Sequence, residues 1–285
     1  MKVHFLYAEK PRERILAEAF LEGVKAHGDQ ASSSPLTPEK TVVDCDVACM
    51  VGVKSRELFA AYTKARTHVI YLDKGYSRHK VDSSSMRVWE YWRVAVDAHH
   101  PTKYLANAKN GPDRWDQLGF TLKPWRKSGT RVILAGSSQK YHDFYRLSDP
   151  TRYWSKVMRR LQRINPNFYY IYRPKPSWKD AVPIVGATYT TFCNIEEELQ
   201  DSFCMITHGS NACFEALLMG IPCIVLGDAV AKPISSTQLE DINNIRVPTN
   251  EERQQLFNNL AYMQWTQPEM LSGEAWSHIK PQIFG

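Results

Sequence analysis

Long hydrophobic runs are missing from this sequence. Its 285 residues contain no stretch approaching the roughly 18 apolar residues of a membrane helix, and the N-terminal MKVHFLYAEK becomes charged after a short apolar segment. This pattern predicts a soluble, cytoplasmic protein that does not bind a membrane.

Cysteine patterns and phosphate-loop motifs are also missing. The cysteines have neither the CxxC spacing of a zinc site nor the density of a disulfide scaffold, so we expect reduced packing residues. Cys45 and Cys49 alone could supply only half of a metal site. Neither GxxxxGK[ST] nor GxGxxG occurs, so a P-loop ATPase or a Rossmann dehydrogenase has no motif support. The six cysteines are Cys45, Cys49, Cys193, Cys204, Cys213 and Cys223.

An excess of positive charge is confined to one segment. Residues 123–185 carry 14 Lys and Arg against 3 Asp and Glu, whereas residues 1–122 carry 18 against 15 and residues 186–285 carry 4 against 12. Such clustering predicts a polyanionic partner or a phosphate-bearing ligand, the alternative being a solvated basic face. Within it, RYWSKVMRRLQRINP predicts a helix whose apolar stripe leaves four cations outside. They are Lys156, Arg159, Arg160 and Arg163.

Apolar runs alternate with helical stripes along the whole chain. VHFLYA, VACMVGV and HVIYLD predict strands in the first part, and RVILAG, FYYIYRP, FCMIT and PCIVLGD predict strands after the polar NAKNGPDRWDQLG and KPWRKSG. Because strands and helices alternate, we expect mostly parallel sheets. The sequence therefore predicts an α/β fold of two Rossmann-like domains, 1–122 and 123–255, that face a central cleft. QASSSPLTPEK at 30–40 is interpreted as a polar connection.

Polar residues follow the predicted strands of the second domain. THGSN comes directly after FCMI and leads into ACFEALLMG, so its backbone N–H groups are expected at a helix start, which favours an anion. Glu215 could accept hydrogen bonds from ribose hydroxyls. The alternative is that Ser210 or Asn211 only caps the helix and Glu215 is a surface acid.

Two further strand ends carry residues suited to a phosphate. Gly136 and Ser137 form a small-residue turn able to bring backbone donors to a ligand. Arg173 and Lys175 follow another strand, between prolines that stiffen the turn. Together these strand ends predict a phosphate-bearing ligand.

The segment THGSNACFEALLMGIPCIVLGDA, preceded by YRPKPS, resembles the nucleotide-sugar half of GT-B glycosyltransferases, particularly those similar to capsular-polysaccharide and Kdo transferases. The resemblance covers residues 130–235 and implies a nucleotide-sugar donor, most simply a UDP-sugar. It implies that Glu215 faces the ribose and Arg173 a phosphate or the sugar. Lys175 stands where the related pattern often has His, which keeps a phosphate contact but disfavours proton transfer. The residues implied to face the diphosphate are His208, Gly209, Ser210 and Asn211.

The same resemblance implies that the first domain binds the acceptor and that residues 256–285 return to it. Sugar transfer to a hydroxyl is helped by a base that takes the acceptor proton. Asp73 follows HVIYL, and Asp97 follows YWRVAV with His99 and His100 close behind. Both acids are candidate bases, although each could instead be a turn or cap residue.

A basic surface and many aromatic residues resemble, in overall character, phage-encoded enzymes that glycosylate hydroxymethylated or hydroxylated pyrimidines in DNA. A base inside duplex DNA must be flipped out, which calls for cations on phosphates and aromatics that stack. We therefore expect a hexosyl- or pentosyltransferase acting on double-stranded DNA in the host cytoplasm. A capsular or lipopolysaccharide-type glycan acceptor and a non-enzymatic nucleotide or nucleic-acid binding module are the alternatives. The aromatics are Trp89, Tyr91, Trp92, Trp115 and Trp125.

A DxD-like acidic pair is absent from the predicted strand ends of the nucleotide half. Glu240 and Asp241 are adjacent on a predicted helix and so point in different directions. The sequence predicts a transfer that needs no metal or is only weakly aided by one.

Overall fold

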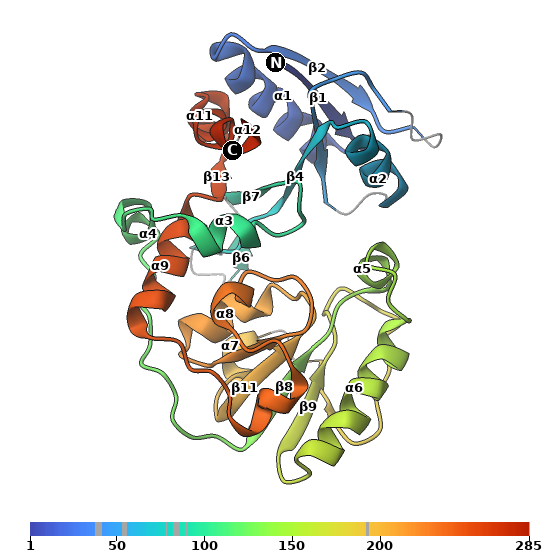
Figure 1. Cartoon of the computed structure of the whole chain (residues 1–285), viewed down its shortest axis with the longest axis vertical. Helices are drawn as coiled ribbons and strands as arrows, with labels where there is room; N and C mark the ends of the chain where they lie inside the picture. The colour runs from blue at the N-terminus through green and yellow to red at the C-terminus, as the bar shows by residue number, and fades with distance from the viewer. Residues whose placement is uncertain are drawn as a thin grey trace. The chain divides into compact units, whose positions relative to one another are not determined.

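The computed structural model describes residues 1–37, 42–52, 56–77, 79–81, 86–88, 91–191 and 194–284. Two residues discussed above, Trp89 and Cys193, lie outside these ranges. The chain divides into two compact units, Met1–Pro101 with Ala261–Gly285, and Thr102–Leu260 (Figure 1). None of the helices in the described part of the chain has both the length and the apolar character needed to cross a membrane.

The boundary between the units lies after Pro101, earlier than the predicted 122. The reason is that α3 (Thr102–Asn107) and α4 (Asp113–Gln117) belong to the second unit. Thr102 donates to Asp228 at 3.0 Å, and the Trp115 ring packs on Phe257 with centroids 4.6 Å apart. Because NAKNGPDRWDQLG is polar, the sequence does not indicate these contacts and instead favours a boundary between the domains at this stretch.

The first unit contains a six-stranded sheet in the order β13-β7-β4-β3-β1-β2. β1 to β4 run parallel to one another, β7 runs antiparallel to β4, and β13 runs antiparallel to β7. A separate two-stranded ribbon is formed by β5 (His79–Val81) and β6 (Met86–Val88). The six strands are β1 (Lys2–Tyr7), β2 (Gln30–Pro35), β3 (Val47–Val51), β4 (His68–Lys74), β7 (Tyr91–Val96) and β13 (Gln264–Thr266).

Two of these strands correct the sequence analysis. The serine-rich segment expected as a connection forms the edge strand β2, because His4 of β1 holds it with ring nitrogens 2.8 Å from the Ser32 hydroxyl and 2.9 Å from the Ser34 hydroxyl. The C-terminal tail, in which the sequence analysis predicted no strand, contributes β13, which pairs Trp265 with Trp92. Tertiary pairing overrides weak strand propensity in both segments.

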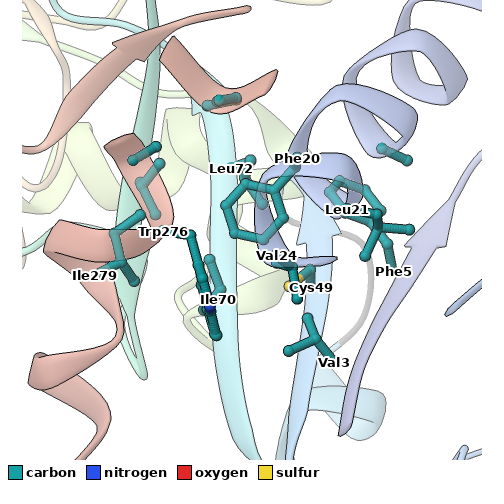
Figure 2. Close-up of a cluster of buried hydrophobic side chains, with 14 of the residues drawn as sticks. Val3, Phe5, Phe20, Leu21, Val24, Cys49, Ile70, Leu72, Trp276 and Ile279 are labelled. Carbon is teal, nitrogen blue, oxygen red and sulfur yellow. The ribbon is translucent and has the colours of Figure 1, made fainter. Parts of the chain in front are cut away.

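The return of the chain end to the first unit is confirmed. Helices α10 (Gln267–Leu271) and α11 (Glu274–Ile279) pack with α1 (Pro11–Ala26), and α12 (Pro281–Phe284) packs with α11. Helix α2 (Arg56–Lys64) completes the unit. Figure 2 shows Trp276 and Ile279 beside Phe20 and Ile70 in one apolar core. Asp29 anchors this tail by accepting hydrogen bonds from the Trp276 indole and the Lys280 ammonium, both at 2.8 Å.

The second unit contains a parallel sheet in the order β10-β9-β8-β11-β12. Its strands are β8 (Arg131–Ala135), β9 (Tyr169–Arg173), β10 (Thr188–Tyr189), β11 (Ser202–Thr207) and β12 (Cys223–Val225). Its other elements are α5 (Gln139–Phe144), α6 (Pro150–Ile164), α7 (Ile195–Glu198), α8 (Ala212–Leu218), η1 (Lys232–Ile234), η2 (Leu239–Asn243) and α9 (Asn250–Ala261). The predicted strands and the α6 and α8 helices are confirmed.

Helix α6 has the amphipathic arrangement that its sequence predicts. Trp154, Val157, Met158 and Leu161 are buried against β8 and β9, and the four cations of the opposite face are exposed. The Asp149 carboxylate caps the helix by accepting from the Arg152 N–H at 2.9 Å.

Candidate functional site

The carboxyl ends of four strands in the second unit lie in register. Thr207 of β11 pairs with Ala135 of β8 and with Val225 of β12, and Ala135 pairs with Arg173 of β9. Because the strands are parallel, the segments that follow them emerge at one edge. The structure therefore brings together the predicted residues after β8, β9 and β11, together with Asp228 after β12. We call this the donor edge: residues 136–138, 173–175, 207–211 and 226–232.

Three backbone N–H groups of the donor edge are used within the protein. Thr207 Oγ1 accepts from the N–H groups of Gly209 at 3.2 Å and Ser210 at 2.9 Å, and it donates to the Ala135 carbonyl. The Gly136 N–H donates to the Arg173 carbonyl at 2.8 Å. Ser210 Oγ accepts from the Ala212 N–H at 3.3 Å, but Ser210 precedes the N-cap residue Asn211, and no side-chain hydrogen bond caps α8. These three N–H groups are therefore not available to a ligand, which leaves side chains and the other N–H groups of the edge.

Close packing explains two glycines of the edge. A Cβ on Gly209 would lie 1.8 Å from Tyr141 Oη, and a Cβ on Gly227 would lie 2.2 Å from the His208 ring. Such distances exclude any larger residue without a rearrangement. These glycines make room for His208 and Tyr141, which the sequence analysis did not connect.

His208 sits in a cage of tyrosine rings. Its centroid lies 5.6 to 5.8 Å from those of Tyr141, Tyr145 and Tyr153, and its Nδ1 lies 3.0 Å from Tyr141 Oη. Burial, which is the largest cause, together with the nearby His142 and the Lys232 ammonium lowers the pKa of His208 to about 4. His208 is therefore neutral near pH 7 and can act as an uncharged hydrogen-bonding group.

Of the two cations predicted to face a phosphate, Arg173 and Lys175, only Lys175 is exposed at the donor edge. The Arg173 side chain is buried and its Nε lies 2.6 Å from the buried Glu198 carboxylate of α7, so the positive charge of Arg173 is compensated inside the protein. Lys175 and Lys232 are exposed, whereas Glu215 is 5% exposed within α8. Lys232 was missed, although it is one of only four cations in residues 186–285, and that scarcity is the signal that could have identified it.

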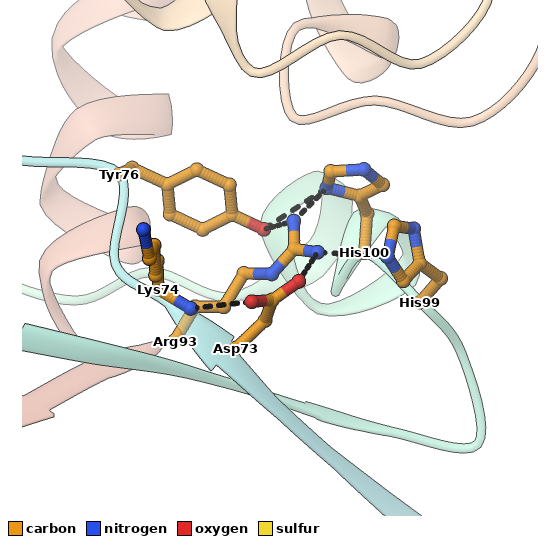
Figure 3. A network of polar contacts seen from close by, with 6 residues as sticks. All are labelled: Asp73, Lys74, Tyr76, Arg93, His99 and His100. Carbon is orange, nitrogen blue, oxygen red and sulfur yellow. Dashed lines mark hydrogen bonds and ion pairs between the residues drawn. The ribbon is translucent and has the colours of Figure 1, made fainter. Parts of the chain in front are cut away.

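A second polar cluster lies on the sheet of the first unit and centres on Arg93 (Figure 3). This side chain is 3% exposed; its Nη2 lies 3.2 Å from Asp73 and 2.8 Å from His99 Nε2, and its Nη1 lies 3.1 Å from His100 Nδ1. Tyr76 Oη lies 3.0 Å from the same His100 nitrogen. Because arginine only donates, the two imidazole nitrogens accept from it. We call these five residues the Arg93 cluster.

The two predicted bases, Asp73 and Asp97, lie at opposite ends of a pair of strands, because β7 runs antiparallel to β4. Asp73 ends β4 and joins the Arg93 cluster with its side chain 38% exposed, whereas Asp97 follows the antiparallel β7 and lies at the opposite edge of the sheet. Asp97 accepts from the Val69 N–H at 2.8 Å and its other oxygen lies 2.8 Å from His68 Nδ1. It adopts a left-handed φ of 54°, which fits the turn-residue alternative. The sequence did not reveal that this strand runs antiparallel.

The nucleic-acid residues predicted on α6 lie together on its exposed face but are not equivalent. Arg160 forms an ion pair with Glu240 of η2 at 2.6 Å, which reduces its charge toward a ligand. Lys156, Arg159 and Arg163 have no ion-pair partner within the described residues. Two aromatics expected to stack on a base, Trp92 and Trp115, are instead buried in the cores at 8% and 3% exposure.

No three metal-ligating side chains of His, Cys, Asp or Glu gather within the ranges that the structure describes. Metal independence of the reaction stays a prediction.

Comparisons with known proteins identify the fold. No protein-family model matches the chain, and no curated protein sequence matches it. Two structures of KpsC from Thermosulfurimonas dismutans are similar. The β-Kdo 2,4 transferase has a TM-score of 0.54 and 14% identity, covering 92% of this chain and 91% of that one. The β-Kdo 2,7 transferase has a TM-score of 0.51 and 12% identity, covering 97% and 99%. At these identities the likeness shows the fold alone: the chain has the two-sheet α/β fold of GT-B glycosyltransferases.

Proposed function

We propose that this protein is a glycosyltransferase that moves a sugar from a nucleotide-sugar donor to a hydroxyl acceptor. The observation that carries the proposal is the donor edge, where four strand ends in register place neutral and cationic side chains around one surface. The GT-B fold, similar along nearly the full chain to two transferases, supports it. UDP is the proposed nucleotide.

The donor phosphates are proposed to contact side chains, because the turn uses its own backbone donors. His208 and Ser210 supply neutral hydrogen-bonding groups, and Lys175 and Lys232 supply positive charge to the leaving nucleotide. Ser137 and Asn211 complete the surface. Gly136 and Gly209 act by leaving space. Arg173 and Glu215, both buried, are proposed to position the edge and to limit the ribose pocket from behind.

Asp73 is proposed as the base that takes the acceptor proton. Its carboxylate is partly exposed while Arg93 fixes one of its oxygens, and the Lys74 N–H donates to the other at 2.8 Å. In the transfer, the acceptor oxygen bonds to the anomeric carbon, its proton passes to Asp73, and the bond to the nucleotide breaks with its electron pair remaining on the phosphate. Asp97 is left out of this proposal because it lies at the other edge of the sheet.

The proposed acceptor is a hydroxymethylated or hydroxylated pyrimidine in double-stranded DNA. Its support is the exposed face of α6, where Lys156, Arg159 and Arg163 carry positive charge without an acidic partner in the described chain. Phosphate contacts of this kind make binding strongly salt-dependent. A capsular-type glycan acceptor is the other outcome of the test below.

The test is turnover of a panel of nucleotide sugars with two acceptors, duplex DNA containing 5-hydroxymethylcytosine and a capsular oligosaccharide. Release of nucleotide together with a mass increase of one sugar on either acceptor supports a glycosyltransferase. Transfer to DNA that declines steeply from low to moderate salt supports the DNA acceptor. Transfer to the oligosaccharide alone contradicts the DNA acceptor, and no transfer or hydrolysis with any donor contradicts the proposed activity.

A further inference from the structure

The two ring nitrogens of His208 have different surroundings. Nδ1 lies 3.0 Å from the hydroxyl oxygen of Tyr141. Nε2 forms no hydrogen bond with any residue that the structure describes, and it keeps contact with solvent because His208 is only half-buried. Nε2 is therefore the nitrogen of this ring that a ligand at the donor edge can reach.

Packing fixes the orientation of the His208 ring. A Cβ on Gly227 would lie 2.2 to 2.6 Å from Cε1, Nδ1 and Nε2 of the imidazole, so the ring occupies the space that a side chain at this position would need. The Tyr145 and Tyr153 rings stand at 62° and 87° to it, with centroids 5.8 and 5.6 Å away. An exchange of Nδ1 and Nε2 would require these rings to move, since protein interiors are closely packed. The same nitrogen thus stays beside Tyr141.

The hydroxyl at Nδ1 bears on where the ring carries its proton. His208 is neutral near pH 7, so the imidazole has a single N–H. An ionised phosphate oxygen only accepts hydrogen bonds, and a phosphate at Nε2 therefore requires the proton on that nitrogen. Nδ1 must then accept, which calls for a donor beside it. A tyrosine hydroxyl can donate, whereas a carboxylate or carbonyl at the same place would draw the proton to Nδ1.

We propose that Tyr141 is a positioning residue that keeps the proton of His208 on Nε2 and so directs an N–H toward the phosphates of the donor. The inference rests on the proposed function, because it concerns how the donor edge recognises a diphosphate. Lys232, which is exposed, supplies charge to the same ligand, and His208 supplies a neutral donor of fixed direction. Tyr141 is 8% exposed and acts through His208.

The ¹⁵N shifts of the His208 ring test the inference without a ligand, because they distinguish a protonated from an unprotonated ring nitrogen. They are recorded on the full chain near neutral pH, and the His208→Gln variant assigns them. The wild type is expected to carry the proton on Nε2. Tyr141→Phe, which loses only the hydroxyl, is expected to shift both nitrogens toward a mixture of the two tautomers. A proton on Nδ1 in the wild type, or wild-type shifts in Tyr141→Phe, overturns the inference.

The consequence for binding is measured with UDP. Tyr141→Phe should raise the Kd for UDP about 2- to 10-fold, as for the loss of one neutral hydrogen bond. The matched control is Tyr153→Phe, which keeps a ring beside His208 and loses a hydroxyl that forms no hydrogen bond with it. This control should bind UDP like the wild type. Equal affinities in Tyr141→Phe and Tyr153→Phe contradict the role of Tyr141.

A double variant separates a positioning role from a structural one. Because Tyr141 acts through His208, Tyr141→Phe is expected to cause no further loss of UDP affinity in a His208→Gln background. A full additional loss in that background contradicts the inference. If neither UDP nor another nucleoside diphosphate binds the wild type, the proposed function is contradicted, and with it the phosphate as ligand. The ring shifts decide the contact between Tyr141 and His208 separately.

Discussion

The donor edge and the Arg93 cluster present polar groups in opposite ways. In the Arg93 cluster one buried guanidinium links a partly exposed carboxylate, two imidazoles and a phenol. At the donor edge the only buried arginine is compensated by Glu198, the turn satisfies itself through Thr207, and His208 is neutral. The first arrangement suits proton removal by Asp73, and the second suits contact with a phosphate through side chains. The two α/β units therefore differ in how their buried charges are compensated.

Replacement of Asp73 should cause the largest loss in the rate of sugar transfer. Asp73→Asn removes the proposed base, so the rate of sugar transfer should fall about 10² to 10⁴-fold with an unchanged Kd for UDP. The matched control is Asp97→Asn, which keeps a residue tolerant of the left-handed turn at the opposite edge and should leave the rate near the wild-type value. Equal losses in the two variants, measured as steady-state rates, would show that Asp73 has no special role.

Removal of Glu198 should show how strongly the stability of the fold depends on the buried ion pair between Glu198 and Arg173. Glu198→Ala leaves Arg173 buried and uncompensated, which should lower the free energy of unfolding by about 3 to 5 kcal/mol in denaturant titrations. The double variant Arg173→Met with Glu198→Leu removes both charges and should recover most of this loss. If the single variant is as stable as the wild type, the pair does not compensate Arg173 as described.

The sequence predicts strands better than it predicts their direction and their contacts. Strand ends of the second sheet could be located from apolar runs, because parallel strands separated by helices leave little choice of topology. The antiparallel course of β7 depends on pairing with β4 and β13, which no local pattern encodes, so the sequence could not show that Asp73 and Asp97 lie at opposite ends of these strands. Thr207 was recognised as the first residue of the THGSN turn, but its role was not predicted: its hydroxyl organises the turn by accepting from two N–H groups.

Other features depend on distant segments. The β2 strand is held by His4, and Arg160 is neutralised by Glu240, 80 residues later. Arg93 did carry a local signal, since it is the one charged residue in YWRVAV. An arginine in a strand requires a partner when it faces the core, and the partner could have been sought among acids on neighbouring strands.

Neutralising Lys232 should have an intermediate effect confined to the donor edge. Lys232→Gln removes a cation proposed to meet the phosphates, so the Kd for UDP should rise about 10-fold in calorimetric titrations. The pKa of His208, followed by NMR of its ring, should be about 4 in the wild type and higher in the variant, because Lys232 disfavours its protonation. An unchanged pKa and an unchanged Kd would place Lys232 away from the site. Lys156→Gln, on α6, is the control.

The lowered pKa of His208 also predicts a dependence of stability on pH. The unfolded chain, with an imidazole pKa near 6.5, binds more protons than the folded protein between pH 6.5 and about 4. The free energy of unfolding should therefore fall as the pH drops through this window, and a His208→Gln variant should lose that part of the slope. The same slope in the variant would assign it to other groups.

The smallest effects concern the basic face of α6. Arg159→Gln should lower the slope of log K against log salt for duplex DNA by roughly 0.9, the value of one phosphate contact. Arg160→Gln should lower it less, because Glu240 already holds that guanidinium, and Glu240→Gln should raise it by releasing Arg160. Identical slopes in the three variants would indicate a solvated face with no polyanionic partner.

The central claim is that the donor edge binds a nucleotide, and titration of the ¹⁵N-labelled protein with UDP tests it most directly. Saturable shifts are predicted for the backbone amides of His208 to Asn211 and of Lys232, with the amides of residues 150–164 on α6 unchanged. The absence of any saturable shift in residues 207–232, for UDP and for the other nucleoside diphosphates, would contradict the account.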